Sequence, residues 1–192
     1  MIITMEFTTM KILLILSISC LLSLNLFAQN LESKELITVS SVDLNRYVGT
    51  WYEIARLPNR FQEKCSGDVT ATYTLLDDGN MKIVNRCRQE DGEFTTAEGL
   101  ARRATEDGPN TRLEVRFAPA FLSFLPFVWG DYWIIDLASD YSYAVIGEPE
   151  RRYLWILARS GQMDENLLGE ILAKVKHQGY DISSLIRTKH MK

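Results

Sequence analysis

Short runs of strand-like sequence, separated by turn signals, fill the chain from about residue 51 to residue 160. Residues 69–75 alternate apolar and hydroxyl side chains with period two, as a half-buried strand does. Residues 112–117 place Leu, Val and Phe on one face and three charged side chains on the other. The predicted strands are residues 51–57, 69–75, 81–87, 94–102, 112–117, 131–137, 143–147 and 153–159.

These eight strands are joined by short turns, such as Asp77-Asp78-Gly79-Asn80, a segment typical of a β-hairpin. Parallel strands would need crossover connections of a dozen or more residues, so the strands are expected to run antiparallel. The pattern therefore predicts an all-β fold. We expect an eight-stranded antiparallel up-and-down β-barrel, because closure removes the exposed sheet edges.

One amphipathic helix is predicted after the strands, over about residues 164–178. Asp164 is a suitable N-cap, Gly179 ends the helix, and Leu, Ile and Val residues form a stripe along one side. Because this stripe needs a surface to cover, we expect the single C-terminal α-helix to pack on the outside of the barrel.

The N-terminal residues are not expected to belong to the fold. An apolar run over residues 12–27 follows Met10-Lys11 and ends before Ala28, which is typical of a secretory signal peptide. This run is too short to favour a membrane-spanning helix, which needs about 20 apolar residues. In an alternative interpretation Cys20 is lipidated and anchors the protein to an outer membrane. Either way the mature protein is exported, as a periplasmic or secreted protein or as an anchored one.

This interpretation divides the chain into three parts. Residues 1–28 are the predicted signal peptide, residues 29–41 a polar leader and residues 42–192 the folded domain. The chain has a formal net charge of −4 and no cluster of Lys or Arg. Its charge therefore gives no support for a nucleic-acid partner.

Two cysteines, Cys65 and Cys87, remain in the predicted mature chain. An exported protein meets oxidising conditions, so a disulfide between them is the default expectation, and two buried free thiols are the alternative. The 22-residue loop that it would close corresponds to about 3 kcal/mol of stabilisation. Histidines and cysteines are not clustered as a zinc site requires, and no metal or cofactor is expected.

Three segments resemble the signatures of the lipocalin family. Residues 47–56, Tyr-Val-Gly-Thr-Trp-Tyr-Glu-Ile-Ala-Arg, resemble the first signature, and residues 140–144, Asp-Tyr-Ser-Tyr-Ala, resemble the second. Residues 153–159, Tyr-Leu-Trp-Ile-Leu-Ala-Arg, resemble the third. The sequence is most similar to the bacterial, Blc-like outer-membrane lipoprotein group. The motif residues are Gly49, Trp51, Asp140, Tyr141 and Arg159.

The three signatures are expected to meet in space. In an up-and-down barrel the start of the first strand, the link between the sixth and seventh strands and the end of the eighth strand lie at one end. The resemblance implies that Arg159 packs there over the ring of Trp51. These residues are interpreted as structural elements that close the barrel, and not as catalysts.

The opposite end is expected to be the mouth, formed by residues 58–68, 89–93, 118–130 and 148–152. One of these segments is unusually apolar for a loop and contains Phe121, Phe124, Phe127 and Trp129. We call residues 118–130 the apolar lip. It is predicted to fold over the cavity, touch a membrane or meet a partner subunit in a homodimer, and the alternative is a strand extension packed in the core.

The strand faces that we expect to point inward form a mostly apolar cup that suits an acyl chain. Basic residues near the mouth, namely Arg60, Lys64, Arg86 and Arg88, are candidates to meet a carboxylate or phosphate head group. The resemblance implies binding or transport of small hydrophobic ligands, fatty acids or lysophospholipids, in membrane maintenance or stress in the cell envelope. The predicted ligand-binding residues are Phe61, Tyr73, Val115, Phe117, Trp129, Tyr153 and Trp155.

Two alternatives come from other functional classes. The first is a lipocalin-fold enzyme that acts on a lipid-like substrate, for which Glu53 is the candidate acid. No Ser-His-Asp set is apparent, and His177 and His190 fall on the final helix and tail, so catalysis and haem ligation are not expected. The second is a dimerising interaction protein of the envelope that buries its apolar lip against a partner.

Overall fold

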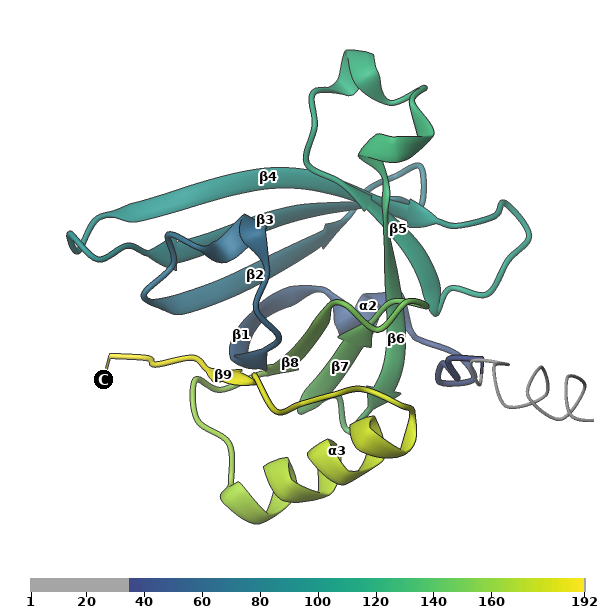
Figure 1. The fold of residues 1–192 in the computed structure, drawn as a ribbon. Helices are drawn as coiled ribbons and strands as arrows, with labels where there is room; N and C mark the ends of the chain where they lie inside the picture. The colour runs from purple at the N-terminus through teal and green to yellow at the C-terminus, as the bar shows by residue number, and fades with distance from the viewer. Residues whose placement is uncertain (1–34, 192) are drawn as a thin grey trace, which may run out of the picture. The chain divides into compact units, whose positions relative to one another are not determined.

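The structure, a computed structural model, describes residues 35–191 and contains a closed β-barrel (Figure 1). Two α-helices are described, α2 (Leu44–Tyr47) and α3 (Glu165–His177), with the short 3-10 turns η1 (Arg60–Gln62), η2 (Ala120–Leu122) and η3 (Pro126–Val128). The strands are β1 (Gly49–Arg56), β2 (Gly67–Leu75), β3 (Met81–Arg88), β4 (Phe94–Arg103), β5 (Arg112–Arg116), β6 (Gly130–Leu137), β7 (Tyr143–Gly147), β8 (Leu154–Ala158) and β9 (Ile186–Arg187).

The sheet closes on itself. Strands β2 to β8 pair in chain order, β8 pairs with β1, and β1 pairs with β2. Each pairing is antiparallel, as short connections require. Within the described residues, eight strands thus form the barrel, and α3 lies outside it. The predicted fold class is confirmed.

The C-terminal segment, residues 186–191, was not expected in the sheet. Residues 49–52 of β1 pair with β2, but the far end of β1 pairs with β9 instead. The amide of Asp68, at the start of β2, donates to the Lys189 carbonyl at 2.8 Å. The C-terminal segment therefore fills a seam between β1 and β2 in the mouth half of the barrel.

Two apolar clusters hold the barrel together. The outer cluster buries the stripe of α3, with Leu168, Ile171 and Val175, against the outer face of β6, β7, β8 and β1. Asp164 caps this helix by accepting hydrogen bonds from the amides of Asn166 and Leu167. The inner cluster contains Val42, Tyr47, Trp51, Tyr73, Met81, Ile83, Ala101, Leu113, Tyr132, Ile134, Ala144, Ile146 and Leu157.

The compact unit that contains the barrel begins at Leu36. Leu36 is buried in the outer cluster, and the amide of Val39 donates to the Ile134 carbonyl at 3.0 Å. The predicted signal peptide, its cleavage site and Cys20 lie outside the described residues. Over residues 35–191, none of the helices has the length and apolar character to cross a bilayer.

Candidate functional site

The three signature segments meet at one end of the barrel, which we call the floor. The guanidinium of Arg159 lies 3.8 Å from the ring centroid of Trp51. It also donates to the carbonyls of Arg46, Tyr47 and Thr50 at 2.7, 3.1 and 3.1 Å. Trp51 is fully buried, and its indole N–H donates to the Tyr47 carbonyl. Arg159 thus ties the strand that follows α2 to the end of β8.

Backbone conformation explains the glycine of the first signature. Gly49 has φ +96°, a region that side chains with a Cβ rarely adopt. A Cβ at this position would also lie 3.3 Å from an amino nitrogen of Arg159. In the second signature, the Tyr141 hydroxyl accepts from the Asp43 amide at 2.8 Å, and Asp140 accepts from the Ser142 amide. Hydrogen bonding by the Ser142 side chain, and then by its amide, lowers the pKa of Asp140.

Three tyrosines fill the inner cluster just above the floor. The Tyr132 hydroxyl lies 2.8 Å from those of Tyr47 and Tyr73, and the three form one hydrogen-bonded group. Burial raises the pKa of Tyr73 to about 12 and those of Tyr47 and Tyr132 well above their usual range. Tyr73, predicted to bind ligand, is thus packed and only 3% exposed.

Aromatic side chains form a wall at the mouth half of the barrel. Tyr153 stacks on Trp155 with ring centroids 5.9 Å apart, and Phe61, from η1, lies 5.6 Å from Tyr153. The carboxylate of Glu148, in the β7–β8 loop, accepts from the Tyr153 amide at 3.0 Å and fixes that end of the wall. These three of the predicted ligand-binding residues are brought together. We call Phe61, Tyr153 and Trp155 the aromatic wall.

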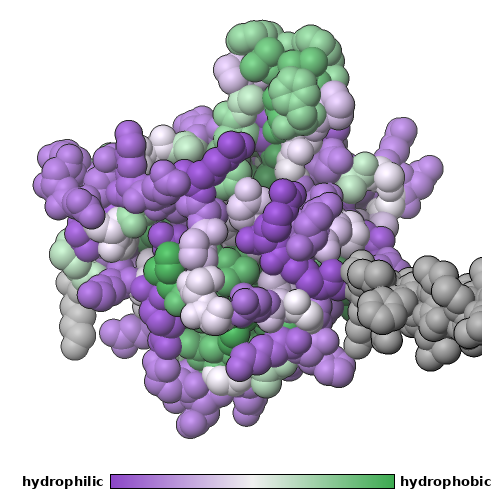
Figure 2. All heavy atoms as spheres, viewed as in Figure 1, coloured by the Kyte–Doolittle hydropathy of each residue, from purple (hydrophilic) through white to green (hydrophobic). Residues whose placement is uncertain are grey.

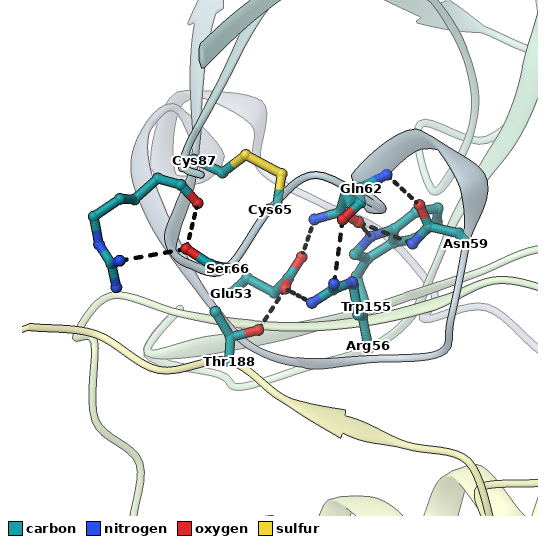
Figure 3. The surroundings of a disulfide bond; sticks show 10 residues. Glu53, Arg56, Asn59, Gln62, Cys65, Ser66, Cys87, Trp155 and Thr188 are labelled. Carbon is teal, nitrogen blue, oxygen red and sulfur yellow. Dashed lines mark hydrogen bonds and ion pairs between the residues drawn. A yellow bond between two sulfur atoms is a disulfide. The ribbon is translucent and has the colours of Figure 1, made fainter. Parts of the chain in front are cut away.

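A polar cluster lies beside Trp155 of the aromatic wall (Figure 3). Glu53 and Arg56 of β1 form an ion pair at 3.0 Å, and both are nearly inaccessible to solvent. Gln62 donates to Glu53 at 2.6 Å and accepts from the indole N–H of Trp155 at 2.8 Å. Thr188, from the C-terminal segment, also donates to Glu53. The carboxylate of Glu53 thus accepts hydrogen bonds from three side chains, which gives it a structural role.

The sequence indicated only Glu53 from this cluster. Arg56 ends the first signature, three residues after Glu53, and in a regular strand the two side chains would lie on opposite faces. A register shift between Glu53 and Ala55 changes this, because Glu53 pairs with Leu157 and Arg56 with Trp155. Leu157 and Trp155 both face the inner cluster, so Glu53 and Arg56 point inward together.

The remaining predicted residues lie on or near β5 and β6. Val115 packs against the inner cluster, and Phe117 approaches β4 so closely that a Cβ on Gly99 would lie 2.8 Å from its ring. Trp129 differs from the expectation. It packs under the guanidinium of Arg102 at 3.8 Å, and Arg102 is on the outward face of β4, so this indole is not part of the inner lining.

The apolar lip projects from the barrel between β5 and β6 (Figure 1). Its two 3-10 turns expose Phe121, Phe124 and Phe127 by 75%, 77% and 80%. Figure 2 shows an apolar cluster over this projection. The lip is therefore neither a strand extension in the core nor a cover that buries its own phenylalanines.

The predicted disulfide is present. Cys65, after η1, is bonded to Cys87 near the end of β3, with Cα atoms 5.6 Å apart (Figure 3). The adjacent Ser66 amide donates to the Arg88 carbonyl at 2.8 Å. This bond ties the loop that carries Phe61 and Gln62 to the barrel wall.

Two of the four basic residues proposed for a head group, Arg86 and Arg88, make their contacts on the outer face, whereas Arg60 lies 5.3 Å from the ring centroid of Phe61. Arg86 lies 3.3 Å from the ring centroid of Phe94, and Arg88 forms an ion pair with Asp68 at 2.6 Å. Arg86 and Phe94 line an open groove of about 690 Å³ that also contacts His190, and Arg86 is cross-strand from Thr70 on the outer face. The groove is outside the barrel, so Arg86 is not available to a ligand inside it.

Comparisons with known proteins agree with this geometry. A family model described as a lipocalin-like domain matches residues 42–190. The chain is 42% identical over 158 residues to temperature-induced lipocalin-1 of Arabidopsis thaliana, covering 82% of this chain and 84% of the plant protein. It is 38% identical over 149 residues to the outer membrane lipoprotein Blc of Escherichia coli K12, covering 77% and 79% of the two chains.

Solved structures support the fold alone, since their sequence identity is low. Insecticyanin of the tobacco hornworm Manduca sexta aligns with a TM-score of 0.61 at 22% identity, over 83% of this chain and 86% of that protein. Apocrustacyanin C1 aligns with a TM-score of 0.61 at 19% identity, over 78% and 81%. Together with the closed barrel and the signature cluster at its floor, these matches show that the chain belongs to the lipocalin family, with bacterial outer membrane lipoproteins among its relatives.

Proposed function

We propose that this protein binds a single-chain amphiphile, a fatty acid or a lysophospholipid, and carries it in the cell envelope. Membership of the lipocalin family supports a small hydrophobic ligand, and it favours binding over catalysis. The aromatic wall of Phe61, Tyr153 and Trp155, above a packed apolar interior, is the observation that supports a fatty acid or lysophospholipid as the ligand. Such a lining suits an acyl chain with few polar contacts.

The tyrosine group limits how deeply a ligand would enter the barrel. Tyr47, Tyr73 and Tyr132 fill the barrel near the floor with their hydroxyls paired. A ligand is therefore expected in the mouth half, next to the aromatic wall and not against Trp51. The disulfide, which holds the loop of this wall, is consistent with an exported protein in an oxidising compartment.

The envelope location and the membrane contact are parts of the same proposal. Relatives of this chain in Escherichia coli and Vibrio cholerae are outer membrane lipoproteins, which supports export to the envelope. Three exposed phenylalanines on one projecting loop are unfavourable in water and favourable in the interface of a bilayer. We propose that the apolar lip touches the membrane from which the ligand is taken or to which it is delivered.

Binding is tested with delipidated protein. Fatty acid and lysophospholipid are titrated separately while tryptophan fluorescence is followed, and lipid that copurifies with the untreated protein is identified by mass spectrometry. We expect saturable binding, with a fluorescence change that is mostly lost in Trp155→Phe although binding persists. Absence of saturable binding of either lipid, with no copurified lipid, would exclude the proposal.

A further inference from the structure

The ion pair inside the barrel is unevenly satisfied. Glu53 and Arg56 are 2% and 7% exposed, and both point to the inner face. The carboxylate of Glu53 accepts hydrogen bonds from Arg56, Gln62 and Thr188. Its two oxygens are therefore well supplied with donors.

The guanidinium of Arg56 has the opposite situation. One amino nitrogen donates to Glu53 at 3.0 Å, and the other reaches the Gln62 carbonyl only at 3.5 Å. Within residues 35–191, its buried Nε–H has no hydrogen-bond partner. A buried N–H without an acceptor is costly, and it is rare in folded proteins. The site as built lacks an acceptor oxygen, not a donor.

The Nε–H of Arg56 lies close to the region where the ligand is proposed to bind. Gln62 contacts both members of the pair and also accepts from the indole N–H of Trp155. The guanidinium therefore lies near Trp155, one of the three side chains of the aromatic wall (Figure 3). An apolar wall with one polar anchor at its edge matches an amphiphile. An arginine donor selects an anionic oxygen, as in a carboxylate or phosphate.

We infer that Arg56 is the anchor for the anionic head group of the ligand, donating from its Nε–H to a carboxylate or phosphate oxygen while the acyl chain packs on the aromatic wall. This inference rests on the proposed function and names the recognised chemistry. Glu53 then acts as a positioning residue that holds the guanidinium on the inner face. The basic residues on the outer face take no part.

The test compares ligands that share a chain and differ in the head group. Palmitic acid is paired with hexadecanol, and lysophosphatidylcholine is paired with monopalmitoylglycerol, each titrated below its micelle concentration. For the native protein, we expect at least one anionic or phosphate-bearing ligand to bind about tenfold more tightly than its neutral partner, the scale of one charge-assisted hydrogen bond. The pair with the preference identifies carboxylate or phosphate as the source.

Variants assign that preference to Arg56. The double variant Glu53→Gln/Arg56→Gln removes both charges, so that no single buried ion remains, and it should abolish the preference while neutral ligands bind within about twofold of the native protein. Glu53→Gln alone keeps the guanidinium but removes the carboxylate that positions it, so this variant should reduce the preference without abolishing it. Arg86→Gln is the matched control on the outer face, and it should also leave the preference unchanged. Circular dichroism establishes that each variant is folded.

The outcomes separate the inference from the proposed function. If head-group pairs bind equally well to the native protein, or if the double variant retains the preference, Arg56 is not the anchor although lipid binding stands. A parallel loss of affinity for charged and neutral ligands in the double variant would likewise assign Arg56 a purely structural role. If none of the four ligands binds the native protein, the proposed function fails together with the inference.

Discussion

Arg159 illustrates how much of the floor depends on a single side chain. Its guanidinium stacks on Trp51 and donates to two carbonyls of α2 and one of β1. Lysine can keep the charge but not this planar set of donors. We expect Arg159→Lys to lower the free energy of unfolding by about 1–3 kcal/mol, from the loss of one or two hydrogen bonds and part of the stacking. Urea unfolding measures this difference.

Arg102→Lys is the matched control. Arg102 also stacks on a tryptophan, Trp129, at 3.8 Å, but its side chain is 45% exposed and its ion pair with Glu114 lies at the surface. Exposed pairs of this kind contribute little. Equal destabilisation by the two substitutions would contradict the role of Arg159 as a tie of the floor.

The buried tyrosines predict a response to alkaline pH. Burial raises the pKa of Tyr73 to about 12 and those of Tyr47 and Tyr132 well above their usual range. Above about pH 10 the unfolded chain releases these phenol protons while the folded barrel retains them. The folded state then binds more protons, so its stability falls as pH rises.

We therefore expect the free energy of unfolding to decrease as pH rises from about 10 towards the pKa of Tyr73 at about 12. Tyr132→Phe removes one of the three raised groups and should make this decrease shallower, although the protein is less stable at neutral pH. Urea unfolding at several pH values, with tyrosinate absorbance, measures both effects. Ionisation of these tyrosines before any loss of near-ultraviolet circular dichroism would contradict the argument.

Among the secondary-structure elements, the C-terminal segment makes more hydrogen bonds to the barrel wall than its two-residue strand β9 suggests. The Thr188 amide donates to the Ile54 carbonyl at 3.0 Å, the Asp68 amide to the Lys189 carbonyl at 2.8 Å, and His190 bonds to the Glu53 carbonyl at 2.8 Å. Residues 186–191 thus join β1 to β2 where these strands no longer pair. The segment completes the wall of the barrel.

Removal of residues 186–192 is expected to open this seam. The free energy of unfolding should fall by about 2–4 kcal/mol, on the scale of several hydrogen bonds of about 1 kcal/mol each. The Asp68 amide, which loses its acceptor, should exchange with solvent much faster, as hydrogen exchange would measure.

The control for this truncation is Arg187→Ala, which breaks only the exposed ion pair with Glu165 at 2.7 Å. It should change the free energy of unfolding by less than about 1 kcal/mol and leave the exchange of the Asp68 amide nearly unaltered. If the truncated protein is as stable and as protected as the native one, the segment is an accessory to the barrel and not part of its wall.

For the whole molecule, the membrane contact proposed for the apolar lip leads to a testable prediction. Phe124→Asp/Phe127→Asp places two charges on side chains that are 77% and 80% exposed, so the fold should be unaffected. We expect this variant to lose binding to phospholipid vesicles, measured by cosedimentation, while its affinity for the soluble ligand stays the same. Ile37→Asp changes an apolar side chain that is 58% exposed elsewhere, and it should bind vesicles normally.

Light scattering over a range of concentrations tests the alternative, in which the apolar lip contacts a second subunit in a homodimer. A dimer that dissociates in Phe124→Asp/Phe127→Asp, together with no vesicle binding by the native protein, would assign the lip to a subunit interface. A monomer that binds vesicles through the lip would support the membrane contact.

Much of this molecule is determined by local sequence. The alternating faces of residues 69–75 and 112–117 specify strands, because one side of each must be buried. Short connections leave only an antiparallel meander, and the residue types at Gly49, Trp51 and Arg159 identify the family and its floor. The disulfide was predicted from the two cysteines of a chain that is expected to be exported.

The arrangement of the candidate site, by contrast, is apparent only in the tertiary structure. The tyrosine group joins residues 47, 73 and 132, and no local pattern reveals which distant hydroxyls will meet. A one-residue register shift in β1 brings Glu53 and Arg56 to the same inner face, where strict alternation would separate them. The C-terminal segment enters the wall only because β1 and β2 diverge. The tyrosine group and the ion pair depend on which distant side chains meet when the barrel closes, and the position of the C-terminal segment depends on the backbone groups that β1 and β2 leave unpaired. Periodicity along the chain specifies neither.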